Sequence, residues 1–277
     1  MKNPYSYQKI PRSRIATFDV FSIGLSRHHV SAILEFDVTE SRKKLQNQRR
    51  NGVDISFNAW LIKIISMVVV KHKEAAAFLY NKKKLIIFDN VNVSILIEKR
   101  MNGEKVPIPM LIERSNGKSA LEISSEIKKA KDQELTKNDF VIDKKISRIE
   151  NLYYYMPGFL RKASWRIMLN KPRYVFQKMG NVVITSVGMM GKINGWFIHK
   201  SIHPLSFGVG SIIRKPAIVC NQIKIREILN MTILCDHDLM DGAPMVRFLN
   251  DLTKSIESGE EIECASGLVN NRGEGMV

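Results

Sequence analysis

The most informative segment of the chain is Met231-Thr-Ile-Leu-Cys-Asp-His-Asp-Leu-Met-Asp-Gly-Ala-Pro-Met-Val-Arg-Phe-Leu249. Its first five residues form an extended apolar run, and apolar residues recur at helical spacing from Met245 onward. Asp241 stands where its side chain can accept the free amides of that helix, while Gly242 and Pro244 mark the turn and the first helical residues. This pattern predicts a strand that breaks into a helix, with His237 exposed and fixed on the turn at a sheet edge.

Composition limits the class of protein without choosing a function. The chain has 277 residues, of which 44% are hydrophobic, enough for one large α/β domain or two small ones. Lysine and arginine number 43 against 27 aspartate and glutamate, a net charge of +16. Such a charge predicts attraction to a polyanion: a nucleic acid, an anionic membrane, an acidic carrier protein or a phosphorylated cofactor. A basic, solvated surface without a specific partner is the alternative.

Cysteine usage and the N-terminus predict an intracellular protein. Cys220, Cys235 and Cys264 are odd in number and scattered, which favours neither a disulfide framework nor a zinc site. The first ten residues lack an apolar signal core, and no run approaches the roughly 18 uncharged residues of a membrane span. We therefore expect a cytoplasmic protein, either soluble or peripheral to a membrane.

The order of elements predicts one α/β domain over residues 1–277. Strands are expected at 29–38, 85–88, 91–98, 105–113, 182–186, 207–213, 217–220 and 231–235, and helices at 39–50, 57–73 and 119–133. Ser56 is a plausible N-cap for the second helix. Pro107 and Pro109 place their strand at an edge, because proline cannot donate to a β-ladder. A tail at about 260–277 is expected to be loosely held.

Residues 134–180 differ from the rest, because aromatic residues alternate with basic ones. Two short helices, broken at Pro157-Gly158 and at Lys171-Pro172, fit this segment best. The mixture is compatible with a membrane-surface patch, or with a groove for an acyl chain or a nucleic acid. The alternative is a helical insertion that packs its aromatic residues on the domain.

The turn around His237 is the candidate site. Four acidic or imidazole side chains within six residues suggest a metal, but Met240 and Asp241 stand where a calcium loop needs an oxygen ligand and then glycine. No elbow serine of a Ser-His-Asp hydrolase is present, and no nucleic-acid-binding motif accompanies the charge. Histidine titrates near neutrality, so His237 remains as a general base for a thiol or hydroxyl, with a purely structural histidine as the alternative.

Five ordered segments carry a resemblance to a known family. Asp236-His-Asp-Leu-Met-Asp-Gly-Ala243 resembles the Asp-His-Arg-x-x-Asp-Gly-Ala signature of the catalytic domain of dihydrolipoamide acyltransferases of 2-oxo acid dehydrogenase complexes, and satisfies the His-x-x-x-Asp-Gly of chloramphenicol acetyltransferase. Val183-Ile-Thr-Ser-Val-Gly-Met-Met-Gly191 is similar to the family's Phe-Thr-Ile-Ser-Asn-Leu-Gly-x-x-Gly. Weaker likenesses lie at residues 29–38, 106–112 and 247–252, so the resemblance covers the chain in order except for 134–180.

The resemblance implies a chloramphenicol acetyltransferase-like two-layer α/β sandwich with a mixed β-sheet and flanking helices. It also implies a homotrimer with active sites between subunits, and acyl transfer between coenzyme A and a thiol, hydroxyl or amine acceptor. His237 would be the general base, and Thr185 would donate a hydrogen bond to the tetrahedral oxyanion, with Ser186 as the alternative donor. Asp241 would hold the site together, no metal is implied, and the residues that bind coenzyme A stay unknown.

Two departures from the family pattern bear on function. Asp238 replaces the usual arginine, and a carboxylate there would make His237 a weaker base unless a cation such as Arg14 or Arg27 compensates. No lipoyl domain, proline- and alanine-rich linker or subunit-binding domain precedes the core. We therefore expect no covalent lipoyl group on this chain and an acceptor in trans, such as an acidic carrier protein or a lipoyl domain. A catalytically inactive trimeric scaffold, or an acyl- or coenzyme A-binding protein of the same fold, is the alternative.

Overall fold

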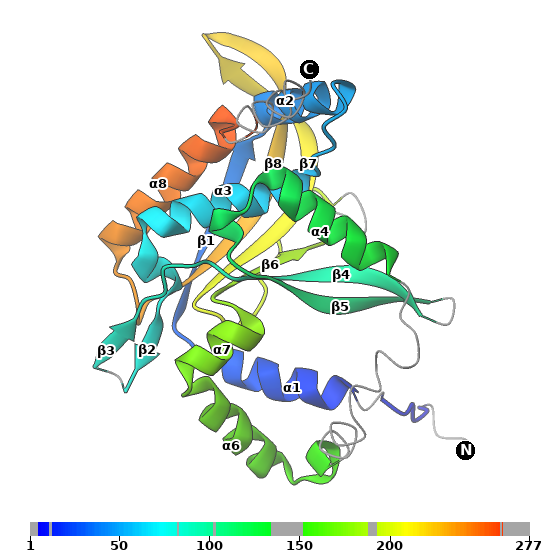
Figure 1. Ribbon diagram of the computed structural model, residues 1–277, viewed down its shortest axis with the longest axis vertical. Coiled ribbons are helices and arrows are strands. Elements are labelled where there is room, and N and C mark those ends of the chain that lie inside the picture. The colour runs from blue at the N-terminus through cyan, green and yellow to red at the C-terminus, as the bar shows by residue number, and fades with distance from the viewer. Residues whose placement is uncertain are drawn as a thin grey trace, which may run out of the picture.

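The computed structural model describes residues 5–10, 13–81, 83–101, 104–133, 152–187, 193–260 and 262. Within these residues, six strands form one mixed sheet in the order β1-β8-β7-β6-β4-β5 (Figure 1). They are β1 (His29–Asp37), β4 (Val93–Met101), β5 (Glu104–Ile112), β6 (Val182–Ser186), β7 (Leu205–Val219) and β8 (Gln222–Asp236). β6 runs parallel to β4 and β7, and the other pairs are antiparallel. A separate hairpin pairs β2 (Phe78–Tyr80) with β3 (Lys84–Ile86).

Helices cover one face of this sheet (Figure 1). They are α2 (Thr39–Arg50), α3 (Phe57–Lys71), α4 (Ala120–Asp132) and α8 (Gly242–Ser258), with α2 at one end of the molecule. Trp60 of α3 and Phe248 of α8 are fully buried in the same hydrophobic core as Phe36 of β1 and Phe207 of β7. Each such side chain contributes roughly 1.5–3 kcal/mol by leaving water. The predicted α/β sandwich with a mixed sheet is therefore confirmed.

Local sequence signals set most of the element boundaries. Ser56 caps α3 as predicted, because its hydroxyl accepts the amide of Ala59. Ser119 and Glu122 form a reciprocal capping box at the start of α4. The strand with two prolines, β5, is an edge strand as expected. α3 ends two residues earlier than predicted, at Lys71, and a 3-10 turn (Lys73–Ala76) follows.

The predictions for β7 and β8 were too short. The expected strands at 207–213 and 217–220 are one strand of 15 residues, and the strand expected at 231–235 is the end of a second strand of 15 residues. Cys220 and Asn221 join them, with φ angles of 51° and 59°, the left-handed values of a tight hairpin turn. The outer half of this hairpin extends past the helices (Figure 1), so it carries polar and basic residues that hide the strand pattern.

A second group of helices lies at the other end of the molecule from α2 (Figure 1). α6 (Gly158–Leu169) and α7 (Pro172–Met179) begin where the prolines predicted a break, and α1 (Ser13–Gly24), which the sequence did not predict, packs on α6. The buried carboxylate of Asp19 accepts hydrogen bonds from Arg161 Nε (2.7 Å) and the Tyr153 hydroxyl (2.8 Å). The part of the predicted insertion at 134–151 lies outside the described residues.

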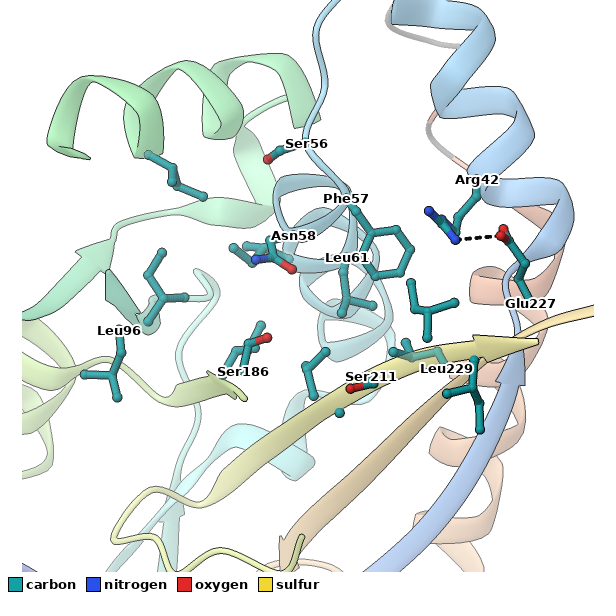
Figure 2. Close-up of a pocket in the computed structure, with 18 of the residues that line it drawn as sticks. Arg42, Ser56, Phe57, Asn58, Leu61, Leu96, Ser186, Ser211, Glu227 and Leu229 are labelled. Carbon is teal, nitrogen blue, oxygen red and sulfur yellow. Dashed lines mark ion pairs between the residues drawn. The ribbon is translucent and has the colours of Figure 1, made fainter. Parts of the chain in front are cut away.

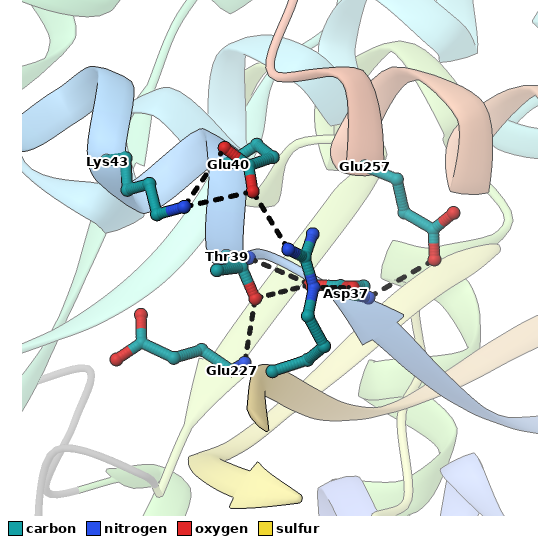
Figure 3. A network of polar contacts seen from close by, with 7 residues as sticks. Asp37, Thr39, Glu40, Lys43, Glu227 and Glu257 are labelled. Carbon is teal, nitrogen blue, oxygen red and sulfur yellow. Dashed lines mark hydrogen bonds and ion pairs between the residues drawn. The ribbon is translucent and has the colours of Figure 1, made fainter. Parts of the chain in front are cut away.

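Polar contacts join β1, α2 and β8 where the hairpin leaves the domain (Figure 3). Arg226 binds Asp37 (2.6 Å) and Glu40 (2.9 Å), and Thr39 donates to Asp37 (2.6 Å). Burial alone would raise the pKa of Asp37, but these hydrogen bonds hold it below its ordinary value. At the chain's end, Trp60 Nε1 donates to the Glu260 carbonyl (2.9 Å), which ties down the start of the predicted loose tail. The rest of that tail, beyond residue 262, lies outside the described residues.

Candidate active site

The His237 turn is fixed by the two strands beside it. The backbone amide of His237 donates to the carbonyl of His28 (2.9 Å), just before β1, and the amide of Leu239 closes the turn on the Asp236 carbonyl (3.1 Å). The His237 side chain itself is exposed. The turn follows the end of β8, which lies next to the edge strand β1. A fixed backbone thus presents an accessible imidazole.

Asp236 and Asp238 have different partners. The Asp236 carboxylate is fully buried, where it accepts hydrogen bonds from Arg27 Nη1 (3.0 Å) and from the amide of Asp238 (3.2 Å). The exposed carboxylate of Asp238 pairs with Nδ1 of His28 (2.9 Å). Arg27 therefore neutralises Asp236 and is not the cation that was expected to compensate Asp238. Arg14 lies exposed on α1.

Asp241 is the N-cap residue of α8, but not in the predicted manner. Its backbone is extended, with φ −73° and ψ 171°, and its carbonyl accepts the amide of Met245 (3.1 Å). Its side chain makes no capping hydrogen bond, so the predicted contact of the carboxylate with the helix amides is wrong. The physical reason is exposure, because water solvates this carboxylate as well as the amides would.

Thr185 and Ser186 end β6 and point to opposite faces of the sheet, because side chains alternate along a strand. Ser186 shares its face with Ile184, which packs in the core beneath the helices. Thr185 is half-buried on the other face, where it pairs with Gly208 of β7. Each of the two candidate oxyanion donors can therefore bind only a substrate that lies on its own face of the sheet. The glycine-rich turn predicted after them falls at 187–191, of which only Val187 is among the described residues.

Ser186 lines a pocket of about 1140 Å³ between the sheet and the helices (Figure 2). Its floor is apolar, with Leu61 of α3 and Leu229 of β8 among the lining residues. Arg42 of α2 stands at its side and pairs with Glu227 (2.8 Å). The sequence offered no signal for this pocket, because the lining comes from elements spread between residues 42 and 229 that only folding brings together.

The strand register separates His237 from Thr185 within one chain. Thr185 pairs with Gly208, and Gly208 pairs with Thr232, five residues before His237 on β8. At about 3.3 Å per residue along a strand and about 4.8 Å between strands, the two Cα atoms are roughly 19 Å apart. Two groups that bind the same thioester carbonyl must lie much closer together, so one chain does not bring these two residues together.

The neighbouring thiol and carboxylates do not form a second catalytic group. Burial, with a smaller contribution from the Asp236 carboxylate, raises the pKa of the Cys235 thiol to about 12, so this thiol stays protonated and is no nucleophile at neutral pH. Among the described residues, no three histidine, cysteine, aspartate or glutamate side chains are grouped to hold a metal ion. The accessible imidazole at the turn belongs to His237.

Comparison with known proteins relates this geometry to a family. The family model of the 2-oxoacid dehydrogenases acyltransferase (catalytic domain) matches residues 24–141 and 176–263. A dihydrolipoyllysine-residue acetyltransferase component of the pyruvate dehydrogenase complex, from Rickettsia conorii, is 24% identical over 93% of this chain and 55% of its own length. A lipoamide acyltransferase component of the branched-chain α-keto acid dehydrogenase complex, from Bacillus subtilis, is 21% identical over 84% of this chain and 47% of its own length. The chain spans about half the length of the curated relatives it matches.

Solved structures share the fold. A probable dihydrolipoamide acetyltransferase from Listeria monocytogenes aligns with a TM-score of 0.65 and 18% identity, over 92% of this chain and 96% of that one. The dihydrolipoamide acetyltransferase of Azotobacter vinelandii aligns with a TM-score of 0.64 and 16% identity, over 93% and 94%. With the family model matched over most of its length, this chain belongs to the family of 2-oxoacid dehydrogenase acyltransferase catalytic domains.

Proposed function

We propose that the protein is a coenzyme A-dependent acyltransferase that uses His237 as its general base. The observation that carries this proposal is the exposed imidazole of His237 on a turn whose backbone is held by His28 and Asp236. The names of the relatives above refer to dihydrolipoyllysine or lipoamide, so the acceptor class proposed here is the dithiol of a lipoyl group. Hydroxyl and amine acceptors are the alternatives.

The proposed reaction balances without a metal or a redox partner. The imidazole of His237 takes the proton of the attacking thiol, and the sulfur forms a bond to the thioester carbonyl carbon. Thr185 donates a hydrogen bond to the resulting oxyanion. The intermediate then collapses, the bond to the original sulfur breaks, and the imidazolium returns its proton to the departing thiolate. A positioned base contributes about 10²- to 10⁴-fold and one oxyanion donor about 10²- to 10³-fold.

The reaction needs two copies of the chain. His237 and Thr185 lie two strands apart in one sheet, separated by roughly 19 Å as the register indicates. We propose that His237 of one copy faces Thr185 of the next in a homotrimer. The cubic core of a pyruvate dehydrogenase multienzyme complex, which this chain resembles with a TM-score of 0.65, is itself an assembly of such domains. The net charge of +16 suits the phosphates of coenzyme A and an acidic carrier.

An acyl-transfer assay tests this proposal. Purified protein is given acetyl-coenzyme A and dihydrolipoamide, and S-acetyldihydrolipoamide is measured. His237→Ala is expected to lower kcat by about 10²- to 10⁴-fold while KM for both substrates changes little, because a base acts on the transition state. His28→Ala is the comparison, since it removes the exposed imidazole next to the same turn without removing the proposed base. Turnover by His237→Ala at the wild-type rate would contradict the mechanism.

Asp238 motivates a second candidate, a catalytically inactive scaffold or acyl- or coenzyme A-binding protein. It stands where the family signature has arginine, and it pairs with His28 instead of with a cation of fixed charge. If the protein is inactive in this way, acetyl-coenzyme A is not turned over, whichever acceptor is supplied. Calorimetry then separates its two forms, because a binding protein takes up coenzyme A and a pure scaffold does not.

We propose in addition that the segment from Tyr153 to Phe176 contacts an anionic membrane. Tyr155, Phe159 and Ile167 are 61–72% exposed, and Lys162 and Arg166 are exposed beside them. Apolar and basic side chains mixed in this way suit the interface of an anionic bilayer. Among the described residues, no helix is both long and apolar enough to cross one. Cosedimentation with phosphatidylglycerol vesicles tests the proposal, and equal sedimentation after Phe159→Ser and Ile167→Ser would remove it.

A further inference from the structure

One row of residues crosses the sheet on the face away from the helices. Thr185 of β6 pairs with Gly208 of β7, which pairs in turn with Thr232 of β8. Directly paired residues point to the same face, with Cβ positions about 4.5–5.5 Å apart. Phe207 and Met231, which alternate with this row, point into the helix-covered core. Two hydroxyl side chains therefore flank a glycine on the face of the sheet opposite the helix-covered core.

The imidazole of His199 lies over that glycine. A Cβ atom added to Gly208 would meet Nδ1 of His199 at 2.8 Å and Cε1 at 3.1 Å, closer than side chains tolerate. The ring thus occupies the space that any other residue at position 208 would fill. With paired Cβ positions about 5 Å apart, Nδ1 lies within about 8 Å of the Cβ atoms of both Thr185 and Thr232. The hydroxyls of Thr185 and Thr232 are therefore the two side-chain groups of this row that flank the ring.

The other ring nitrogen is already held. Nε2 of His199 is hydrogen-bonded to the hydroxyl of Ser206, a fully buried residue of β7. In contrast, Nδ1 of His199 and Oγ1 of Thr232 are buried without a hydrogen-bond partner among the described residues. Burial, aided by the nearby His29, lowers the pKa of His199 to about 4, so the ring is neutral and carries one N–H at pH 7. Buried polar atoms nearly always have hydrogen-bond partners, so we expect Nδ1 of His199 to form a further hydrogen bond.

We infer that His199 is a positioning residue of the acyl-transfer site, where it orients the hydroxyl of Thr185. The Ser206 hydroxyl donates to Nε2, Nδ1–H donates to Oγ1 of Thr185, and the Thr185 hydroxyl hydrogen is left to donate to the oxyanion. Each donor in such a chain polarises the next, which strengthens the last hydrogen bond. This inference rests on the proposed function, and it adds a residue that no motif in the sequence indicated.

The experiment is a kinetic comparison with acetyl-coenzyme A and dihydrolipoamide. His199→Leu removes the ring's donor and is expected to lower kcat about 10- to 100-fold, with KM for both substrates within about twofold, because only the transition state is affected. His199→Asn places an amide N–H near the position of Nδ1 and is expected to recover most of that loss. A ring that only fills space would give equal losses in both variants, which would overturn the inference.

A double-mutant cycle identifies the partner. In the background of Thr185→Val, the further change His199→Leu is expected to cost less than about twofold, because the group it acts through is already absent. An undiminished loss in that background would overturn the assignment. A cycle with Thr232→Val separates the two flanking hydroxyls, and coupling to Thr232 alone would also overturn it.

Two controls are needed: one for the folding of each variant, and one for the acyltransferase activity on which the inference rests. Thermal unfolding and size-exclusion chromatography check each variant, and Ser206→Ala, a smaller change, replaces His199→Leu in the cycle if that variant does not fold. A wild-type protein without transferase activity would overturn the proposed function and this inference together. An active wild-type protein that loses turnover in His237→Ala but keeps it in His199→Leu would overturn this inference alone.

Discussion

At the scale of single residues, the site depends on which face of a strand a hydroxyl occupies. Thr185 and Ser186 are neighbours in the chain, and a one-residue change in alignment exchanges them. The pleat separates them, however, since Ser186 lines the helix-side pocket and Thr185 lies on the opposite face beside Gly208. If Ser186 is the oxyanion donor, the thioester binds in the helix-side pocket; if Thr185 is the donor, the thioester binds on the opposite face of the sheet.

Paired variants decide between these two hydroxyls. Thr185→Val keeps the branched shape and removes the hydroxyl, and it is expected to lower kcat by about 10²- to 10³-fold. Ser186→Ala removes one hydroxyl from the adjacent position on the opposite face, so it is the matched comparison. Steady-state kinetics with acetyl-coenzyme A and dihydrolipoamide give both values. A larger loss in Ser186→Ala than in Thr185→Val would assign the donor to Ser186 and the thioester to the pocket.

A buried histidine makes the stability of the fold depend on pH. Burial lowers the pKa of His203 to about 4, although its hydrogen bond to the Met179 carbonyl opposes this. Between pH 6.5 and 4 the unfolded chain binds a proton that the folded chain does not, so the free energy of unfolding falls as the pH falls through this window. The full effect is about 3 kcal/mol, and it is absent above pH 6.5.

Urea unfolding between pH 4 and 7 measures this dependence. His203→Gln is expected to make the decline in unfolding free energy shallower, because the amide does not titrate. Part of the decline should remain, because burial also lowers the pKa of His199 to about 4. His28→Gln removes an exposed imidazole and serves as the control. An equally steep decline in His203→Gln and in the wild-type protein would show that other groups cause the acid sensitivity.

At the scale of elements, polar contacts hold α6 on α1, where apolar packing alone would be weak. α6 has no buried residue, yet it lies against α1 because Arg161 and Tyr153 share the buried carboxylate of Asp19. Burial, together with the hydrogen bond to Asp19, raises the pKa of Tyr153 above its ordinary value, although a hydrogen bond from Trp165 opposes the shift. The position of the basic, aromatic segment therefore depends on a few hydrogen bonds.

Arg161→Leu is expected to release α6 from α1. Among the described residues, the substitution leaves the buried Asp19 carboxylate with the Tyr153 hydroxyl as its remaining side-chain donor, a costly arrangement. Hydrogen exchange followed by mass spectrometry should show faster exchange at 158–169, with the sheet unchanged. Lys162→Leu, an exposed neighbour on the same helix, is the control. Unchanged exchange in Arg161→Leu would show that α6 is held by other contacts.

At the scale of the whole molecule, the β7–β8 hairpin offers the surface for a second copy. Ile218, Ile223 and Ile225 are 76–80% exposed, and the pairing of Ile218 with Ile223 and of Pro216 with Ile225 places all four side chains on one face. An apolar patch on an element that extends from the domain is typical of a protein contact. The proposed mechanism requires a contact between two copies, because His237 and Thr185 lie two strands apart within one chain.

Ile223→Glu is expected to shift the protein toward a monomer of 31.7 kDa in light scattering after size exclusion. A buried charge in the interface would oppose assembly, and acyl transfer should fall in proportion. Gln222→Glu adds the same charge on the opposite face of the strand and is the control. An unchanged mass in Ile223→Glu would exclude the hairpin from the interface.

The sequence by itself determined the elements and the catalytic candidate. Periodicity and caps predicted α2, α3, α4 and α8. The motif around His237, together with four further segments in the same order, indicated the family, because each of these signals is local in the chain. The sequence did not reveal the full hairpin, whose outer half is exposed, nor the side-chain role of Asp241, which depends on solvent.

Only the tertiary structure decided the relations between distant residues. It set Thr185 and Ser186 on different faces, paired Arg27 with Asp236 rather than with Asp238, and brought His199 over Gly208. It also separated His237 from Thr185 by two strands and five residues of register. The physical reason is that the order of the strands depends on contacts between segments far apart in the chain, and that order, together with the register, sets the distance between residues on different strands.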